Sequence, residues 1–426
     1  MRVTLITCTI AIHGRWAVGG IAGAHDEVDL PVMRDPRHSG RAHLPGSSLA
    51  GSLREHLGAD AVTWLGSSIG PYEETPPKDA EGPAPGRLRI LGTRPITAGI
   101  SSRGTTAVDR ARGAARAGAL RTEESVEATT VRLLMEHEGP VETSLVAALT
   151  SWRPYVGRGR SVGLGEGEVT AVEAFTVDLD NDDHLTWWLG ERTAYLLGTG
   201  QPPVGALRPS DDLGTADRPE ANAEAPMSVA MTVVEPIHIG VHESGDEVRL
   251  KSTLRGRGGI PYVPGASWKG VFRHRVEFIL DATGAAPADR DDIVEVLFGG
   301  PRIGRGLLVF HDSEITAKRL EKRTHVAIDR FTGAARDGSL FTLQSVPRGS
   351  SLTLRIGGAT DDGVVNLINH VLRDLSEGLL GVGRSATRGY GWVSCREADR
   401  PVAAVDPGRL HTLLALLLPA EEEVSS

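Results

Sequence analysis

The amino-acid sequence predicts an α+β protein made of two tandem ferredoxin-like domains with inserted loops. Three observations lead to this prediction: the length of the chain, an internal duplication of motifs, and one order of strand and helix patterns that occurs twice. The chain has 426 residues, which at about 150 residues per domain is enough for two or three domains. We therefore expect each half to fold around its own core.

Three motifs of the first half return in the second half in the same order. The pairs are residues 45–54 with 264–273, 108–120 with 328–340, and 157–169 with 381–393, at offsets of 219, 220 and 224 residues. The first pair is a Pro-Gly-Ser motif, and the last is a glycine-rich loop. Self-similarity of this kind indicates a repeated structural unit. The protein is therefore predicted to be a tandem duplication.

Each half begins with a predicted strand, because apolar residues alternate at 3–12 and at 227–233. A helix is expected directly after each Pro-Gly-Ser motif. In the first half Leu49, Leu53 and Leu57 recur every four residues, the spacing of one helix face. The corresponding residues of the second half are Trp268, Phe272, Val276 and Ile279.

A β-rich middle part and a second helix complete each half before the glycine-rich loop and a last strand. The apolar face of this second helix is predicted from Leu145, Ala148, Leu149 and Trp152 in one half, and from Val364, Ile368, Val371, Leu372 and Leu375 in the other. The order strand, helix, strands, helix, strand is that of a ferredoxin-like unit. The expected domains are 1–197 with an insertion near 71–86, a linker at 198–226, 227–408, and a C-terminal helix with an acidic tail at 409–426.

The composition excludes several classes of protein. Hydrophobic residues make up 40% and charged residues 24% of the chain, which is ordinary globular usage and excludes a wholly disordered or fibrous protein. No window of eighteen apolar residues occurs, so no membrane span is expected. The start of the chain lacks a basic region followed by an apolar run, so no signal peptide is expected. Two cysteines are consistent with a reducing cytoplasm, and we expect a cytoplasmic protein.

The net charge of −9 argues only weakly against a nucleic-acid partner, because local patches decide phosphate binding. Residues 103–121 contain five arginines and one aspartate, and residues 248–259 contain four basic residues and no acid. These patches predict contacts with phosphates. Only five of the 46 basic residues are lysines, so a GC-rich genome that favours arginine on any surface is the alternative explanation.

The glycine-rich loop satisfies the dinucleotide-binding pattern in the second half, but its context excludes that function. The dinucleotide motif follows a strand and opens a helix, whereas this loop follows a helix and opens a strand. The loops carry Arg158 and Arg160 beside Ser161, and Arg384 beside Ser385. Guanidinium groups, hydroxyls and exposed amides suit a phosphodiester chain. The alternative is that the glycines serve only tight turns.

The Pro-Gly-Ser motifs combine a helix start with basic residues on the next turns. The serines at this start are Ser47, Ser48 and Ser267, and the basic residues are Arg54, Lys269 and Arg273. Each serine could be a helix N-cap. A phosphate at the same place would be stabilised by the helix dipole, backbone amides and basic side chains together.

Taken together, the Pro-Gly-Ser motif, the Ile-Asp-Arg-x-Thr-Gly-Ala-Ala segment at 328–335 and the glycine-rich loop resemble the repeat-associated mysterious protein (RAMP) superfamily, with backbone subunits of type III CRISPR effector complexes as the nearest match. The resemblance covers both halves. It implies two RNA-recognition-like folds that hold guide RNA, and β-hairpin thumbs that interrupt pairing with target RNA. It implies as partners a guide RNA, a target single-stranded RNA and other subunits of the complex.

From the resemblance and the basic patches we predict an RNA-binding set. It comprises Ser47, Ser48, Arg54, Arg103, Arg110, Arg158, Arg160, Ser161, Lys251, Ser267, Lys269, Arg273, Arg330, Arg384 and Ser385. The first half departs from the family pattern, because Ala50 stands where the second half has Lys269. We therefore expect the second half to bind RNA more tightly.

The resemblance also implies one catalytic site. The family's target-cleaving aspartate lies in a segment of the type Ile-Asp-x-Pro-Val, which residues 28–32 match with Asp29. Residues 247–252 have no aspartate at the matching place, so one site is expected. Asp29 would hold Mg²⁺ near the phosphate while the neighbouring 2′-OH attacks in line. The alternative is a solvated loop carboxylate.

Two other functions remain open on the sequence. A guide-processing ribonuclease of the same superfamily would cut RNA without metal, with His13 or His25 as general base. His13 and His238 stand at the end of each predicted first strand, in places that look equivalent. A non-catalytic structural subunit is the second alternative. The chain lacks the Gly-Gly-Asp-Asp motif of the cyclase subunit and any Gly-x-x-x-x-Gly-Lys phosphate loop.

Overall fold

The structure is a computed structural model that describes nine segments of the chain: residues 1–21, 28–67, 85–109, 114–207, 227–240, 250–251, 253–254, 256–358 and 361–400. Most of the insertion predicted at 71–86, most of the predicted linker and the predicted C-terminal helix lie outside these segments. Two compact units are formed. Unit 1 groups Met1–Ser102, Thr122–Arg160 and Leu164–Asn222, and unit 2 groups Arg103–Arg121, Ser161–Gly163 and Ala223–Ser426.

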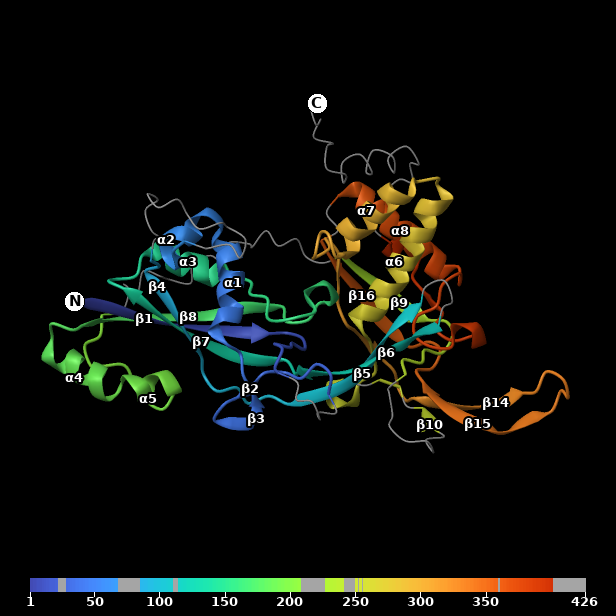
Figure 1. Ribbon diagram of the computed structural model, residues 1–426, viewed down its shortest axis with the longest axis horizontal. Helices are drawn as coiled ribbons and strands as arrows, with labels where there is room; N and C mark the ends of the chain where they lie inside the picture. Colours follow the sequence, from blue (N-terminus) through green and yellow to red (C-terminus); the bar gives the residue numbers. More distant parts are fainter. Residues whose placement is uncertain are drawn as a thin grey trace, which may run out of the picture. The chain divides into compact units, whose positions relative to one another are not determined.

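Unit 1 is built on a four-stranded antiparallel sheet. Its strand order is β4 (Leu88–Thr93), β7 (Thr129–Glu138), β1 (Arg2–Ile12) and β8 (Gly167–Asp178). One face is covered by α1 (Gly46–Leu57), α2 (Ala61–Leu65) and α3 (Thr143–Ser151) (Figure 1). The predicted helix face of α1 is confirmed, because Leu49, Leu53 and Leu57 are buried.

The opposite face of this sheet is covered by two helices that were not predicted. These are α4 (Asp182–Gly190) and α5 (Arg192–Leu197), shown in green in Figure 1. Trp187 and Tyr195 of these helices pack edge-on against Phe175 of β8. Apolar residues on both faces of β1 therefore have a reason: Ile6 faces one core and Leu5 the other.

A hairpin and two short strands are inserted in the sequence between the sheet strands of the first half. The hairpin consists of β5 (Ile100–Asp109) and β6 (Ala114–Val126), and the short strands are β2 (Arg34–Asp35) and β3 (His38–Ala42). Two 3₁₀ turns occupy Gly58–Asp60 and Arg160–Val162. The hairpin enters between the second and third core strands of the half.

Unit 2 has a six-stranded sheet with the order β11 (Tyr262–Val263), β13 (Ser313–Thr316), β16 (Ser351–Gly357), β9 (Met227–Val233) and β17 (Val393–Ser394), and β12 (Val309–Phe310) also pairs with β16. The helices α6 (Gly265–Ala282), α7 (Pro287–Phe298) and α8 (Asp362–Ser376) lie on one face of it (Figure 1). Strand β9 and helices α6 and α8 were predicted from sequence, whereas α7 was not.

A second hairpin, of β14 (Glu321–Ile328) and β15 (Ala335–Ser345), extends away from the helices of unit 2 (Figure 1). The short strand β10 (Leu250–Lys251) pairs in parallel with β15. Three further 3₁₀ turns lie at Arg257–Gly259, Ala386–Arg388 and Glu397–Asp399. In both halves the core strands are arranged second, third, first, fourth, which is the ferredoxin-like order expected from the sequence.

Equivalent backbone hydrogen bonds occur in the two halves. Trp16 and Val126 exchange two hydrogen bonds of 3.0 and 2.8 Å, and Ile237 and Val346 exchange two of the same lengths. The amide of Gly165 donates to the carbonyl of Arg15 at 2.8 Å, and Gly391 donates to Pro236 at 2.8 Å. The same backbone framework therefore occurs in each half.

These bonds correct the alignment of the glycine-rich loops by two residues. The amide of Arg158 donates to Ala17 O at 2.9 Å, and that of Arg384 donates to His238 O at 2.8 Å. Gly157 and Arg158 therefore correspond to Gly383 and Arg384. Ala17, and not His13, is the counterpart of His238. The sequence alignment missed this because glycines recur every second residue in both loops.

Candidate nucleic-acid interface

Asp29 is exposed on a segment that is attached to strand β6. Its Oδ2 accepts a hydrogen bond of 2.6 Å from the amide of Thr122. The next residue, Leu30, donates to Thr122 O and accepts from the amide of Glu124, both at 3.0 Å. The carboxylate predicted to be catalytic is thus held at the surface at a fixed place.

Side chains of Glu124 and Arg158 reinforce this attachment. Glu124 accepts from the amide of Val32 at 3.0 Å and from Arg34 Nη2 at 2.6 Å. Arg158 Nη2 donates to two carbonyls, Leu30 O at 2.9 Å and Glu124 O at 2.8 Å. Arg158, which we predicted to contact phosphate, therefore binds the two backbone segments together.

The second half carries a leucine where the first half carries Asp29. In unit 2, Lys251 pairs in parallel with Leu343, as Leu30 pairs with Glu123 in the first half. Leu250 consequently stands at the position of Asp29. The backbone pairing agrees with the sequence in placing a carboxylate at one of the two positions.

The N-cap residues of α1 and α6 are Pro45 and Pro264, and neither provides a side-chain cap. The amide of Gly265, the first residue of α6, instead donates to Asp312 Oδ1 at 2.8 Å. Ser47 and Ser48 lie inside the first turn of α1, and Ser267 lies inside that of α6. The N-cap interpretation of these serines is therefore wrong. The first turn of each helix, described in full, contains no acidic residue.

Arg54 and Arg273 bind the C-terminal end of the following helix. Arg54 donates to Gly66 O at 2.9 Å and to Leu65 O at 3.1 Å, at the end of α2. Arg273 donates to Gly299 O at 3.1 Å, at the end of α7, and to Glu277 at 3.2 Å. These carbonyls lack partners within their own helix, so the repeated arginine has a structural role in both halves.

Lys269 is half-buried, and its Nζ donates to Ser161 Oγ at 2.8 Å, within the residues grouped as unit 2. Burial lowers the pKa of Lys269, and the cation of Arg273 lowers it further. An anion at this place would favour the charged ammonium. Lys269 and Ser161, both predicted to bind RNA, therefore contact each other.

The remaining predicted residues are spread over the chain. Arg160 forms an ion pair with Glu55 at 3.1 Å and lies 4.4 Å from the ring of Tyr155. Arg103 is half-buried on β5, and Arg330 is exposed at the tip of the second hairpin. Arg110, the side chain of Lys251, and His25 lie outside the described residues.

Beside the glycine-rich loop of unit 2 there is a hollow of about 420 Å³. Arg384, Arg388 and Ser385 are among the residues that line it, and Ser385 has a left-handed backbone conformation with φ of 67°. Arg388 lies 5.5 Å from the ring centre of Phe341 on β15. Sequence reasoning missed Arg388 and Phe341, although Arg388 follows Arg384 in the same loop.

Three rings, of half-buried His325 and Phe341 and of buried Tyr390, lie beside this hollow on the hairpin side. His325 Nε2 and the hydroxyl of Tyr390 are 2.8 Å apart, and the ring of His325 stacks on Phe341 at 5.5 Å. Burial raises the pKa of Tyr390. The hydroxyl therefore stays protonated at neutral pH, and the base of the hairpin is fixed to the loop.

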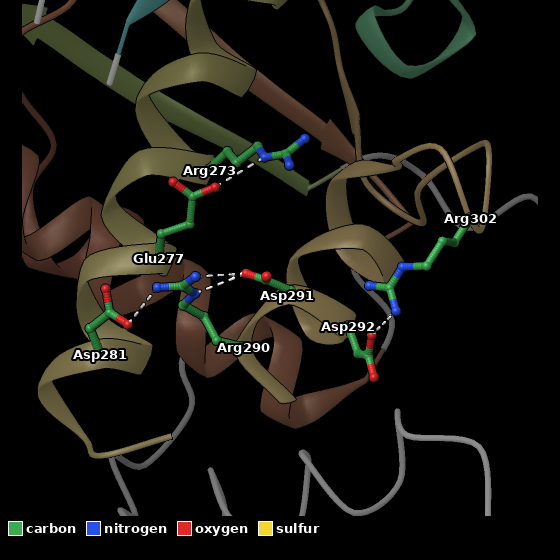
Figure 2. A network of polar contacts seen from close by, with 7 residues as sticks. All are labelled: Arg273, Glu277, Asp281, Arg290, Asp291, Asp292 and Arg302. Carbon is green, nitrogen blue, oxygen red and sulfur yellow. Dashed lines mark hydrogen bonds and ion pairs between the residues drawn. The ribbon is translucent and has the colours of Figure 1, made fainter. Parts of the chain in front are cut away.

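Figure 2 shows a second charged surface of unit 2, between α6 and α7, where a hollow of about 780 Å³ lies. Arg290 bridges Asp281 at 3.0 Å and Asp291 at 2.8 Å, and Arg302 pairs with Asp292. Arg302 also lies 3.3 Å from Glu295 Oε2. The arginines drawn here are already paired with carboxylates. This surface is therefore a poor candidate for phosphate binding.

The tip of the second hairpin presents Phe331 fully exposed, at 100%. Asp329 Oδ1 accepts from the amides of Phe331 and Thr332, both at 2.9 Å. These donors, Thr332 first, lower the pKa of Asp329. An Asx-type turn thus holds an apolar ring in solvent.

Within the described part of the chain, no group of three His, Cys, Asp or Glu side chains is close enough to hold a metal ion. No described helix has the length and apolar character needed to cross a membrane. Residues 230–394, from β9 to β17, match the family model of the RAMP superfamily. A comparison with curated proteins gives no match.

Proposed function

Because residues 230–394 form a RAMP superfamily domain, which implies a CRISPR-associated RNA-binding role, we propose that this chain is a guide-RNA-binding backbone subunit of a type III CRISPR ribonucleoprotein. Two tandem RAMP domains make up the subunit. Its partners are guide RNA, target single-stranded RNA and the other subunits of the complex.

The hollow beside the second glycine-rich loop is the observation that supports this proposal most. Arg384, Arg388, Ser385 and Thr387 line it, and no carboxylate is among its described lining residues. A pair of guanidinium groups with no carboxylate partner among the described residues attracts phosphates even on a chain of net negative charge. The repeat of the backbone framework in the first half supports a second RAMP domain there.

We further propose that the subunit cleaves target RNA at Asp29. A single exposed carboxylate is compatible with Mg²⁺, which keeps several waters and commonly binds through one or two carboxylates plus substrate phosphates. When bound, the metal would stabilise charge on the scissile phosphate. The chain itself contributes the carboxylate of Asp29, whose segment is fixed to β6 by Thr122 and Arg158. The carboxylate would therefore keep one position relative to a bound target RNA.

Salt-dependent RNA binding tests the proposal. The affinity for a labelled single-stranded RNA should fall linearly on a double-logarithmic scale, with a slope of about −0.7 per phosphate neutralised. Sequence should matter little. RNA that copurifies from the host and contains CRISPR repeat sequence would support the guide assignment. A chain that neither copurifies with RNA nor binds it at low salt would contradict the proposal.

A metal-free guide-processing ribonuclease is the second candidate, favoured by one contact. His13 Nε2 lies 3.5 Å from Glu168 Oε1, and its side chain is 57% exposed. A carboxylate can orient an imidazole as general base. Incubation with repeat RNA in EDTA separates the two candidates, because cutting within the repeat without metal would support this second one and His13→Ala should then abolish it.

A further inference from the structure

The equivalent arginines of the two glycine-rich loops have different partners. In the first half, Arg158 Nη2 donates to Glu124 O at 2.8 Å and to Leu30 O at 2.9 Å. The amide of Arg158 donates to Ala17 O, and Ala17 is buried and has only a methyl side chain. The guanidinium therefore reaches the carbonyls beneath it and acts as an internal link.

In the second half a histidine, and not the loop arginine, donates to the carbonyl that corresponds to Glu124 O. Val126 and Val346 are counterparts, so Gln344 is the counterpart of Glu124. Gln344 O accepts a hydrogen bond of 2.8 Å from His238 Nδ1, and His238 is 1% exposed. The imidazole thus stands between the loop and the strand, where the first half has Ala17 and the arginine.

Arg384 is consequently turned outward. It is exposed and lies across Gly240, where a Cβ atom would come within 2.7 Å of Arg384 Cδ. Among the described residues, none forms a hydrogen bond or ion pair with its guanidinium. Arg384 borders the hollow of about 420 Å³ together with Arg388 and Ser385.

We propose that His238 is a positioning residue that makes the hollow of the second half a phosphate-binding site, by occupying the carbonyl of Gln344 and so leaving Arg384 for the ligand. The first half lacks this site because its arginine is used internally. The ligand class, a phosphodiester of single-stranded RNA, rests on the proposed function.

The matched variants Arg384→Ala and Arg158→Ala test the difference between the halves. Arg384→Ala should weaken binding of a labelled single-stranded RNA roughly tenfold and reduce the salt slope by about 0.7, the value for one phosphate. It should leave the midpoint of thermal unfolding unchanged. Arg158→Ala should lower that midpoint and leave the salt slope unchanged at temperatures where the variant is folded.

A double-mutant cycle tests the action of His238 through Arg384. His238→Ala should reduce affinity and salt slope in the wild-type background and have no further effect on either in the Arg384→Ala background. His238→Asn, which retains a donor for Gln344 O, should restore most of the affinity. If His238→Ala does not fold, the Arg384 and Arg158 pair still decides the matter.

The outcomes separate this inference from the proposed function. Wild-type protein that binds RNA with a steep salt slope, together with an unchanged slope for Arg384→Ala, would overturn the inference alone. A reduced slope for Arg158→Ala equal to that for Arg384→Ala would also overturn it. Absence of any RNA binding by the wild type would instead contradict the proposed function.

Discussion

The arginine that ends each Pro-Gly-Ser motif shows how one residue type can be repeated for stability and not for ligand binding. Arg54 and Arg273 lie at equal places in the duplication, and both donate to the last carbonyls of the next helix. From sequence alone, a cation near a helix start and a cation at another helix's end cannot be distinguished, since the second helix is brought close only by folding.

We therefore expect Arg54→Ala and Arg273→Ala to destabilise the protein. Each substitution removes charge-assisted hydrogen bonds to half-buried carbonyls, which should cost about 1–2 kcal/mol of unfolding free energy. Urea unfolding measures this cost. Arg330→Ala, at an exposed hairpin tip, is the control and should change stability by less than about 0.5 kcal/mol. Unchanged stability for Arg273→Ala would return that residue to the RNA-binding set.

At the scale of elements, the glycine-rich loop is fixed by close backbone approach. Gly383 has a φ of 93°, and a Cβ atom there would lie 2.6 Å from His238 O. Gly389, in the same loop, has a φ of 77° and open space around it. The two glycines therefore differ in crowding while both adopt a conformation that favours glycine.

Gly383→Ala should cost about 2–4 kcal/mol of unfolding free energy. The methyl group would strain the positive φ, clash with His238 O and weaken the hydrogen bond from Arg384 N to that oxygen. Gly389→Ala should cost about 1 kcal/mol, from the φ alone. Denaturant unfolding of the two variants makes the comparison. Equal costs would mean that the loop does not depend on this contact.

The tip of the second hairpin should lose its fixed turn in acid. The amides of Thr332 and Phe331 lower the pKa of Asp329, so the turn is stabilised above the ordinary aspartate value of about 4 and loses this contribution as pH falls through the lowered pKa. Full-length protein labelled with ¹⁵N-phenylalanine should show the Phe331 amide shifting with a midpoint below about 4. Asp329→Asn should abolish that titration, and a midpoint at or above 4 would contradict the turn's role.

Periodicity predicted the elements that carry strong apolar spacing and missed those that do not. The faces of α1 and α8 could be read from Leu49 and Leu372 with their neighbours, and these are buried. Helix α7 was missed because its acidic residues obscure the apolar spacing of Ile293 and Leu297, which are buried. In the candidate site, Asp29 could be named from a motif, but its link to Thr122 crosses 93 residues of sequence and is visible only once the sheet is formed.

At the scale of the whole molecule, duplication has kept one framework and allowed the halves to differ at single positions. Ala17 in the first half corresponds to His238 in the second, and Asp29 corresponds to Leu250, at equivalent places of the same hydrogen-bond pattern. The first half thus has the carboxylate on an internally linked segment, and the second half has the outward arginine. We infer a division of labour, with chemistry in the first half and phosphate contacts in the second.

This division predicts that each copy of the chain makes one cut in a guide-paired target RNA. Asp29→Asn keeps an oxygen that can accept from the amide of Thr122 but removes the charge, so guide and target binding should survive while cleavage in Mg²⁺ falls by orders of magnitude. Leu250→Asp is the matched variant. It should leave the number of cuts at one, because among the described residues Arg384 forms no link to the strand like that of Arg158. Denaturing gels of end-labelled target resolve the cut sites. Normal cutting by Asp29→Asn, or two cuts per copy of the wild type, would place the catalytic site elsewhere and leave Asp29 as a surface carboxylate that only fastens its loop.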